Sequence, residues 1–92
     1  METPLTVVIP VYNEGSNFGR LWSEITRHFN FPFSALVAYD FEADDTLPVV
    51  ERILSQGETR LRPIRNSYGP GVVGAIRSGF DQAAAGPVLV LM

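Results

Sequence analysis

Short apolar segments alternate along this chain with segments in which apolar residues recur at intervals of three and four. The short segments are bounded by proline, glycine or polar clusters, which is typical of buried strands. They cover Leu5 to Val11, Ala35 to Tyr39, Arg60 to Ile64 and Val88 to Met92. Pro63 lies inside the third segment, and proline cannot donate a hydrogen bond to a neighbouring strand. The third strand is therefore expected at an edge of the sheet or near a strand end.

The intervening segments predict three amphipathic helices. Their inward-facing residues are expected to be Phe18, Leu21, Trp22, Ile25 and Phe29 in the first, Val49, Val50, Ile53 and Leu54 in the second, and Val72, Val73, Ile76, Phe80 and Ala83 or Ala84 in the third. Ser16 or Asn17 is expected to cap the first helix. Asp45 or Thr46 is expected to cap the second, and Gly57 follows its end.

Strand and helix alternate from one end of the chain to the other, which predicts right-handed crossovers and a sheet covered on both faces. The fold class is α/β, with a three-layer α/β/α arrangement and a mainly parallel four-stranded sheet of Rossmann-like type. We expect residues 1–92 to form a single domain. Ligands of such sheets bind beyond the carboxyl ends of the strands. The loops to search are residues 12–16, 40–45 and 65–71.

Composition narrows the classes of function. Hydrophobic residues make up 46% of the chain and charged residues 18%, which is typical of a globular protein. The formal net charge is -3, so nucleic-acid binding is not expected. Cysteine and lysine are both missing, which excludes a disulfide, a thiolate site and a lysine nucleophile or base.

Membrane and targeting signals are not evident in the sequence. No apolar stretch approaches the roughly 20 residues of a membrane-spanning helix. Met1 to Pro4 show no basic region followed by a long apolar run, so we expect no signal peptide and a cytoplasmic location.

Two loops contain candidate ligand-binding residues at predicted strand ends. Asp40 follows the second strand, where its carboxylate could accept hydrogen bonds from a base or a ribose. Capping of the next helix is an equally good interpretation of Asp40, and the better one for Asp44 and Asp45. Arg65 adjoins Asn66 at the end of the third strand and could contact a base carbonyl or a phosphate.

Gly69, Gly71 and Gly74 satisfy the G-x-G-x-x-G pattern of dinucleotide-binding sites. The pattern follows the third strand, although in that class of protein it follows the first. Two interpretations stay open with similar weight. The glycines either serve a turn and close helix packing, or they bring a phosphate or ribose to the start of a helix. A dinucleotide-binding Rossmann module is accordingly the alternative function.

The stretch Val7-Val8-Ile9-Pro10-Val11-Tyr12-Asn13-Glu14 resembles the opening strand and loop of family 2 glycosyltransferases. The resemblance continues through Val37-Ala38-Tyr39-Asp40 with Asp44 and Thr46, and through Arg65-Asn66 to Gly71. It implies a GT-A fold and glycosyl transfer from a nucleotide sugar that is UDP- or GDP-linked. Within the family the chain is most similar to dolichyl-phosphate mannosyltransferase-like members, which implies a polyprenyl phosphate or a similar acceptor.

The resemblance also implies the positions of the nucleotide-binding residues. Pro10, Tyr12 and Glu14 would line the nucleotide pocket, and Asp40 would hydrogen-bond the base. Arg65 and Asn66 would close the base side, while Gly71 would let the backbone approach the nucleotide. Tyr39 stands where the family often has the first of two aspartates, which leaves the identity of the base open.

In the family the fourth strand leads into a D-x-D-type motif that holds a divalent metal, Mg or Mn, on the sugar diphosphate. This chain ends at Met92, before such a motif. The resemblance therefore implies the nucleotide-binding part of a truncated domain, without a cofactor or metal site, without catalytic residues and without transfer activity of its own. Contact with a membrane would come only from further segments or from a lipid acceptor. The uncovered fourth strand predicts self-association.

Overall fold

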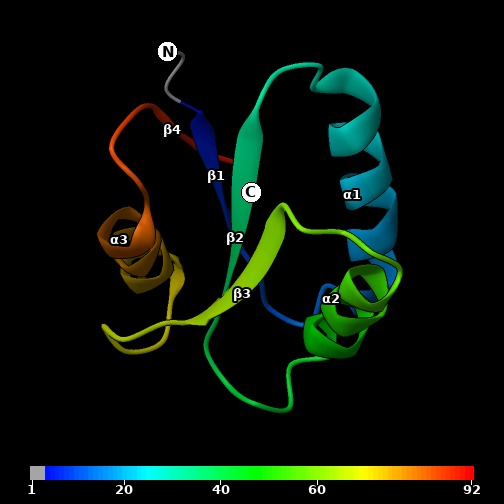
Figure 1. The fold of residues 1–92 in the computed structure, drawn as a ribbon. Helices are drawn as coiled ribbons and strands as arrows, with labels where there is room; N and C mark the ends of the chain where they lie inside the picture. Colours follow the sequence, from blue (N-terminus) through cyan, green and yellow to red (C-terminus); the bar gives the residue numbers. More distant parts are fainter. Residues whose placement is uncertain (1–3) are drawn as a thin grey trace.

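A four-stranded sheet forms the centre of the computed structural model, which describes residues 4–92 (Figure 1). The elements in chain order are β1 (Leu5–Pro10), α1 (Gly15–His28), β2 (Phe33–Tyr39), α2 (Thr46–Ser55), β3 (Leu61–Arg65), α3 (Val72–Gln82) and β4 (Val88–Val90). The strand order is β3-β2-β1-β4, and each neighbouring pair is parallel. The predicted α/β fold class is confirmed, and Pro63 lies in an edge strand as expected.

The expectation drawn from Met1 to Pro4 rests mainly on residues 1–3, which lie outside the described residues. Within the described part of the chain, no helix combines the length and the apolar character needed to cross a bilayer.

The two faces of the sheet carry cores of different size. Helices α1 and α2 cover one face of the sheet (Figure 1). Aromatic side chains pack on β1 and β2 there. This core includes Phe18, Trp22 and Phe33, and the ring centroids of Trp22 and Phe33 lie 6.0 Å apart. The other face has a small core of Leu36, Ala38, Ile64 and Ala75 under α3. Most of the apolar packing therefore lies between the sheet and the first two helices.

The large apolar residues of α3 predict which side of the helix faces the sheet. In the structure a different side of α3 faces the sheet. Its buried residues are Ala75, Ser78 and Gly79, whereas Val73 and Phe80 are 70% and 53% exposed. The reason is the close approach of α3 to β1: a Cβ atom at Gly79 would lie 2.4 Å from Cγ1 of Val8. Small side chains permit this contact, and the large side chains point away from the sheet. The predicted inward stripe of the third helix is therefore wrong for Val72, Val73 and Phe80, whereas Ile76 and Ala83 are half-buried.

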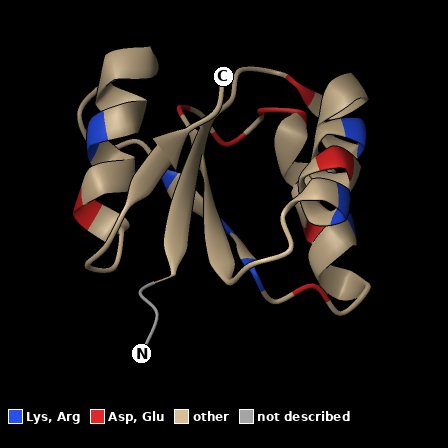
Figure 2. Cartoon of the chain, turned by 90° about the horizontal axis from the view of Figure 1, so that it is seen from above, with Lys and Arg blue, Asp and Glu red and all other residues tan. Residues whose placement is uncertain are grey.

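Charged side chains are distributed unevenly over the two helical layers. Figure 2 shows most of them on the side of α1 and α2, while α3 carries only Arg77 and Asp81. Together with the exposed Val73 and Phe80, this makes the outer face of α3 the more apolar side of the molecule.

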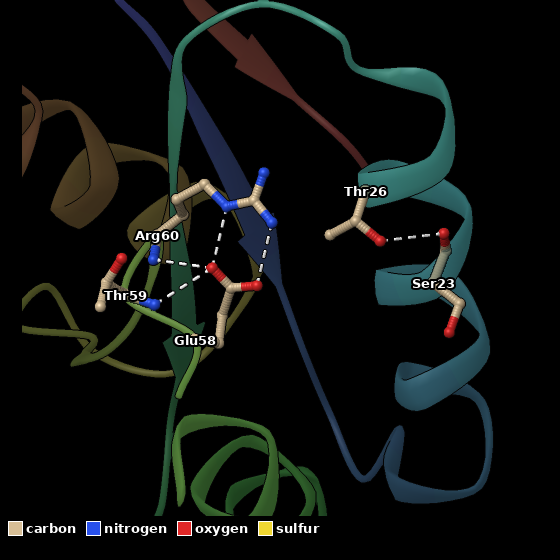
Figure 3. A network of polar contacts seen from close by, with 5 residues as sticks. All are labelled: Ser23, Thr26, Glu58, Thr59 and Arg60. Carbon is tan, nitrogen blue, oxygen red and sulfur yellow. Dashed lines mark hydrogen bonds and ion pairs between the residues drawn. The ribbon is translucent and has the colours of Figure 1, made fainter. Parts of the chain in front are cut away.

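The loop before β3 holds an ion pair between Glu58 and Arg60 (Figure 3). The guanidinium donates from Nε to Oε1 at 2.9 Å and from Nη2 to Oε2 at 3.0 Å. The Glu58 side chain is 15% exposed, and the backbone N–H groups of Thr59 and Arg60 also donate to it. These hydrogen bonds, chiefly those from the Arg60 side chain, lower the pKa of Glu58 to about 2.

The ion pair predicts a pH-dependent contribution to stability. Because the pKa of Glu58 is lower in the folded chain than its ordinary 4.5, its contribution is complete above pH 4.5 and is lost as the pH falls toward 2. Glu58→Gln should lower the free energy of unfolding by about 1 kcal/mol at pH 7, the upper range for partly exposed pairs. Urea unfolding at pH 7 and at pH 2 should show the difference disappearing at the lower pH. Glu51→Gln, at an exposed position of α2, is the control; an equal loss for Glu58→Gln at both pH values would refute the assignment.

Candidate nucleotide-binding site

The loops that follow β1 and β3 meet the start of α3 at the carboxyl edge of the sheet. They enclose a pocket of about 230 Å³, lined by Pro10, Val11, Tyr12, Glu14, Gly71, Val72, Ala75 and Met92. Of the residues predicted for a nucleotide site, the structure therefore brings Pro10, Tyr12, Glu14 and Gly71 together. The contributions of Val72, Ala75 and Met92 could not be inferred from the sequence, because they depend on how α3 and β4 pack beside β1.

The β1–α1 loop is held by side chains from the start of α2. The N–H of Glu14 donates to Oγ1 of Thr46 at 2.8 Å, and the N–H of Gly15 donates to Oδ1 of Asp45 at 2.8 Å. In return, the N–H of Asp45 donates to Oδ1 of Asn13 at 3.0 Å. We call these reciprocal hydrogen bonds the loop clasp. Asn13, in a left-handed conformation with φ of 48°, lies between the pocket residues Tyr12 and Glu14, so the clasp sets the position of both.

The loop clasp also corrects the predicted helix caps. Helix α1 begins at Gly15, so Ser16 and Asn17 lie inside it and neither caps it. Asp45 accepts a hydrogen bond from the first turn of α1 instead of capping its own helix. The N–H of Thr46 is satisfied by Oδ1 of Asp44 at 2.8 Å. A side chain at position 15 would collide with this arrangement, since a Cβ atom there would lie 2.5 Å from the carbonyl oxygen of Asp45.

Asp40 ties the end of β2 to the glycine-rich loop before α3. Its Oδ2 accepts a hydrogen bond from the N–H of Gly71 at 3.0 Å, and its Oδ1 accepts one from Nδ2 of Asn66 at 2.8 Å. Both carboxylate oxygens therefore already have partners within the chain. Through these bonds Asp40 contacts no residue of α2, so its interpretation as a helix cap is wrong. A hydrogen bond from Asp40 to a base stays a prediction.

Asn66 is the central residue of this network and is only 8% exposed. Besides Asp40, its Nδ2 contacts the carbonyl oxygens of Gly69 at 2.6 Å and Gly71 at 3.3 Å. Its Oδ1 accepts from the N–H of Tyr68 at 2.9 Å and from the hydroxyl of Ser78 at 3.1 Å. With both ends of the amide engaged, Asn66 shapes the loop beside the pocket and does not line the pocket itself.

The three glycines of the G-x-G-x-x-G pattern each have a structural explanation. Gly69 and Gly71 adopt φ values of 90° and 120°, which side chains rarely tolerate. A Cβ atom at Gly74 would lie 2.8 Å from the carbonyl oxygen of Gly69. Turn geometry and close packing thus account for the pattern without a dinucleotide.

Arg65 lies at the end of β3 and outside the lining of the pocket. Its Nη1 is 2.5 Å from Oε1 of Glu42, and its guanidinium carbon lies 6.0 Å from the ring centroid of Tyr39. The side chain is 53% exposed and can therefore exchange its surface ion pair for a ligand at small cost.

Phe41 is a residue of this edge that the sequence analysis missed. Its ring meets that of Tyr12 edge to face, with centroids 5.6 Å apart and planes at 62°. Tyr12 is 67% exposed, so one side of its ring is available to a ligand while Phe41 supports it. The available signal was an aromatic residue directly after Asp40, at a predicted strand end.

A larger groove, of about 650 Å³, lies between α1 and α2 and is closed by the loop before β3. We call it the α1–α2 groove; its lining includes Gly19, Trp22, Arg52, Thr59 and Arg60. It lies toward the amino end of β3, and its ion pair Glu58–Arg60 is already satisfied. Because ligands of parallel α/β sheets bind at the carboxyl ends of the strands, the smaller pocket is the better candidate site.

A divalent metal would need several oxygen or nitrogen ligands in one place. Residues 4–92 contain no group of three or more histidine, cysteine, aspartate or glutamate side chains that could hold one. The described residues therefore do not fit a metal site by themselves.

Comparisons with known proteins agree with the fold. The chain superposes on S. aureus TarS 1-349 with a TM-score of 0.78 and 24% identity, covering 97% of this chain and 27% of that one. For S. aureus TarS 1-349 in complex with UDP-GlcNAc the TM-score is 0.73 and the identity 23%, covering 97% and 26%. The chain thus spans about a quarter of the length of these proteins. No protein of curated function matches it in sequence.

The sequence profile of one family extends over nearly the whole chain. Residues 6–92 match it, a range that includes each helix, each strand except Leu5 of β1, and the loops that form the pocket. The resemblance first visible around Pro10 and Tyr12 is therefore not confined to one motif. The chain belongs to glycosyl transferase family 2.

Proposed function

We propose that the pocket at the carboxyl edge binds the nucleotide of a UDP- or GDP-linked sugar, as part of a protein that transfers the sugar. The observation that carries the proposal is the convergence of Pro10, Tyr12, Glu14 and Gly71 on one pocket in a chain of this family. The binding of UDP-GlcNAc by TarS, which has the same fold over these residues, supports a uridine nucleotide as the first ligand to test.

The other predicted residues act around this pocket in the proposal. Asp40 and Asn66 hold the glycine-rich loop so that Gly71 forms one wall. Arg65 pairs with Glu42 at the surface and is 53% exposed, so its side chain is free to reorient toward a bound nucleotide. The walls of the pocket carry no arginine, so the diphosphate gains little from charge neutralisation and binding by residues 4–92 alone should be weak.

The acceptor in the proposal is a polyprenyl phosphate or a similar anion, as the sequence resemblance implies. An oxygen of such a phosphate is already charged and could attack the anomeric carbon with inversion while the nucleoside diphosphate departs. A strong general base would then be unnecessary. Mg or Mn would require ligands beyond the described residues, since these contain no suitable cluster. We therefore place transfer activity, and any contact with the lipid acceptor, in the complete protein, with a cytoplasmic site of action.

Two neighbouring valines of α3 offer a matched test of the pocket. Val72 lines it and is 47% exposed, whereas Val73 is 70% exposed and does not line it. A tryptophan at position 72 would fill the pocket without entering the core. We expect Val72→Trp to weaken UDP binding at least about tenfold, or about 1.4 kcal/mol, and Val73→Trp to leave it unchanged.

Calorimetric or NMR titration with UDP at up to millimolar concentration measures this difference. Equal UDP affinity of the two variants would show that UDP does not bind in this pocket. NAD in the same titration tests the alternative of a dinucleotide-binding module; tighter binding of NAD than of UDP would favour that alternative.

We also propose that the chain self-associates through the outer face of α3 and the open edge of β4. Val73, Phe80 and Leu89 are exposed there, and β4 pairs with β1 on one side only. Phe80→Glu should therefore shift the chain toward monomer, as measured by light scattering across a concentration series. Phe31→Glu, at an exposed aromatic residue before β2, should not. A clean monomer of the unmodified chain at high concentration would contradict the proposal.

A further inference from the structure

The α1–α2 groove takes no part in the proposed nucleotide function, although its volume of about 650 Å³ exceeds the 230 Å³ of the nucleotide pocket. A groove of this size is within the range that binds ligands in proteins. Three apolar side chains line its covered part: Trp22 and Val49 are buried, and Ile53 is half-buried. Its exposed side chains are polar, namely Ser23, Arg52, Gln56, Thr59 and Arg60. The groove therefore combines an apolar wall with a rim of hydrogen-bonding groups.

Gly19 lies inside α1 and lines the groove, yet the fold does not require a glycine there. A Cβ atom at Gly19 would meet nothing within 4 Å, and Gly19 is not among the glycines with positive φ. Gly15 and Gly79 differ, because a Cβ atom would lie 2.5 Å from the carbonyl oxygen of Asp45 at the first and 2.4 Å from Cγ1 of Val8 at the second. A glycine inside a helix is less stable than an alanine. The free space at Gly19 thus costs stability, and an occupant of the groove accounts for it.

The charged groups of the groove favour an anionic ligand. Among the described residues, Glu58 is the one carboxylate of the lining, and both its oxygens already accept N–H groups of Thr59 and Arg60. The remaining nitrogen of the Arg60 guanidinium, Nη1, has no hydrogen-bond partner within the described chain and points away from Glu58 (Figure 3). The ring of Phe33, with its centroid 4.9 Å from the guanidinium carbon, also holds this group in place. Arg52 forms no ion pair with another residue of the described part. Two guanidinium groups are therefore available to a carboxylate.

The charge of the whole chain narrows the kind of anion. With a net charge of -3, the chain as a whole repels long polyanions such as nucleic acids, and anionic membranes as well. A short segment that carries a carboxylate beside an apolar side chain largely avoids this repulsion. It also matches both the guanidinium groups and the apolar wall.

We propose that the α1–α2 groove is a docking site for an acidic peptide segment of a partner protein. Acidic residues of the segment pair with Arg52 and with Nη1 of Arg60, and an aliphatic or aromatic side chain fills the space beside Gly19. The groove lies toward the amino end of β3, so this interaction leaves the nucleotide pocket free.

The test is to select a random library of hexapeptides on the chain and to titrate the enriched peptides by calorimetry. Enriched peptides should carry Asp or Glu close to an aliphatic or aromatic residue, and replacing the acid by its amide should weaken binding about two- to fivefold. Gly19→Leu fills the groove without entering the core and should weaken binding at least about tenfold. Arg52→Glu should weaken it at least about tenfold as well, because it places a like charge beside the carboxylate of the peptide.

Ser16→Leu and Arg27→Glu are the matched controls, since both residues are exposed on α1 and neither lines the groove. They should leave the affinity for the peptides unchanged. Failure to enrich any sequence relative to the Gly19→Leu chain, or enrichment of basic sequences, would overturn the proposal. Displacement of a bound peptide by UDP would also overturn it, because the groove would then belong to the nucleotide. Peptide binding requires no nucleotide, so its failure can be distinguished from failure of the proposed function.

Discussion

Gly79→Ala is expected to destabilise the chain, although an alanine ordinarily stabilises the interior of a helix. A Cβ atom at position 79 would lie 2.4 and 2.6 Å from the two γ-carbons of Val8. Val8 is fully buried in β1, the strand that pairs with both β2 and β4, and cannot move aside easily. Overpacking of this kind costs about 1–3 kcal/mol, which exceeds the gain of about 1 kcal/mol from helix propensity.

Gly19→Ala is the matched control, because Gly19 lies inside α1 and a Cβ atom there would meet nothing within 4 Å. It should raise the free energy of unfolding by about 0.5–1 kcal/mol. Urea unfolding of the two variants beside the unmodified chain measures both changes. If Gly79→Ala were as stabilising as Gly19→Ala, α3 would not lie as close to β1 as the structure places it.

Asn66→Ala is expected to have the second large effect, a loss of about 2–4 kcal/mol in the free energy of unfolding. The side chain is 8% exposed and joins Asp40, two glycine carbonyls, the N–H of Tyr68 and the hydroxyl of Ser78. Alanine would leave several of these partly buried groups without a partner. Leaving a buried polar group without a partner costs more free energy than its hydrogen bond contributes when both partners are present.

Thermal or urea unfolding should be measured for Asn66→Ala together with Asn30→Ala, at an exposed position after α1. The control should change stability by less than about 0.5 kcal/mol. Asn66→Asp, which keeps the acceptor but brings a second carboxylate close to Asp40, should also be strongly destabilising at pH 7. A small effect of Asn66→Ala would mean that the network does not determine the conformation of the glycine-rich loop.

The architecture could be predicted from the sequence because the strand and helix patterns alternate without interruption. Pro63 marked the edge strand, and Gly57, with φ of 101°, marked the end of α2. These signals act locally and do not depend on packing. The buried side of α3 was different: Val73 and Phe80 are larger and more apolar than Ala75 and Gly79, yet the short distance to Val8 decides which residues face the sheet. Such a distance cannot be inferred from periodicity.

The candidate site, like the fold, could be predicted from the sequence only in part. The loops at the carboxyl ends of the strands could be located from the order of elements, and Tyr12, Glu14 and Gly71 do share one pocket. The partners of Asp40 and Asp45 could not be inferred, because both side chains accept hydrogen bonds from residues about 30 positions away in the chain. For Phe41 the sequence offers an aromatic residue after a strand, but its contact with Tyr12 depends on how the two loops pack.

We expect nucleotide to bind at the carboxyl edge of the sheet and not in the larger α1–α2 groove. Amide chemical shifts recorded during a UDP titration test this most directly, because each pocket has its own set of backbone N–H groups. The largest shift changes should fall on Tyr12, Glu14, Asp40, Gly71 and Val72. Changes concentrated on Gly19, Trp22, Arg52 and Thr59, or no change at millimolar UDP, would contradict it.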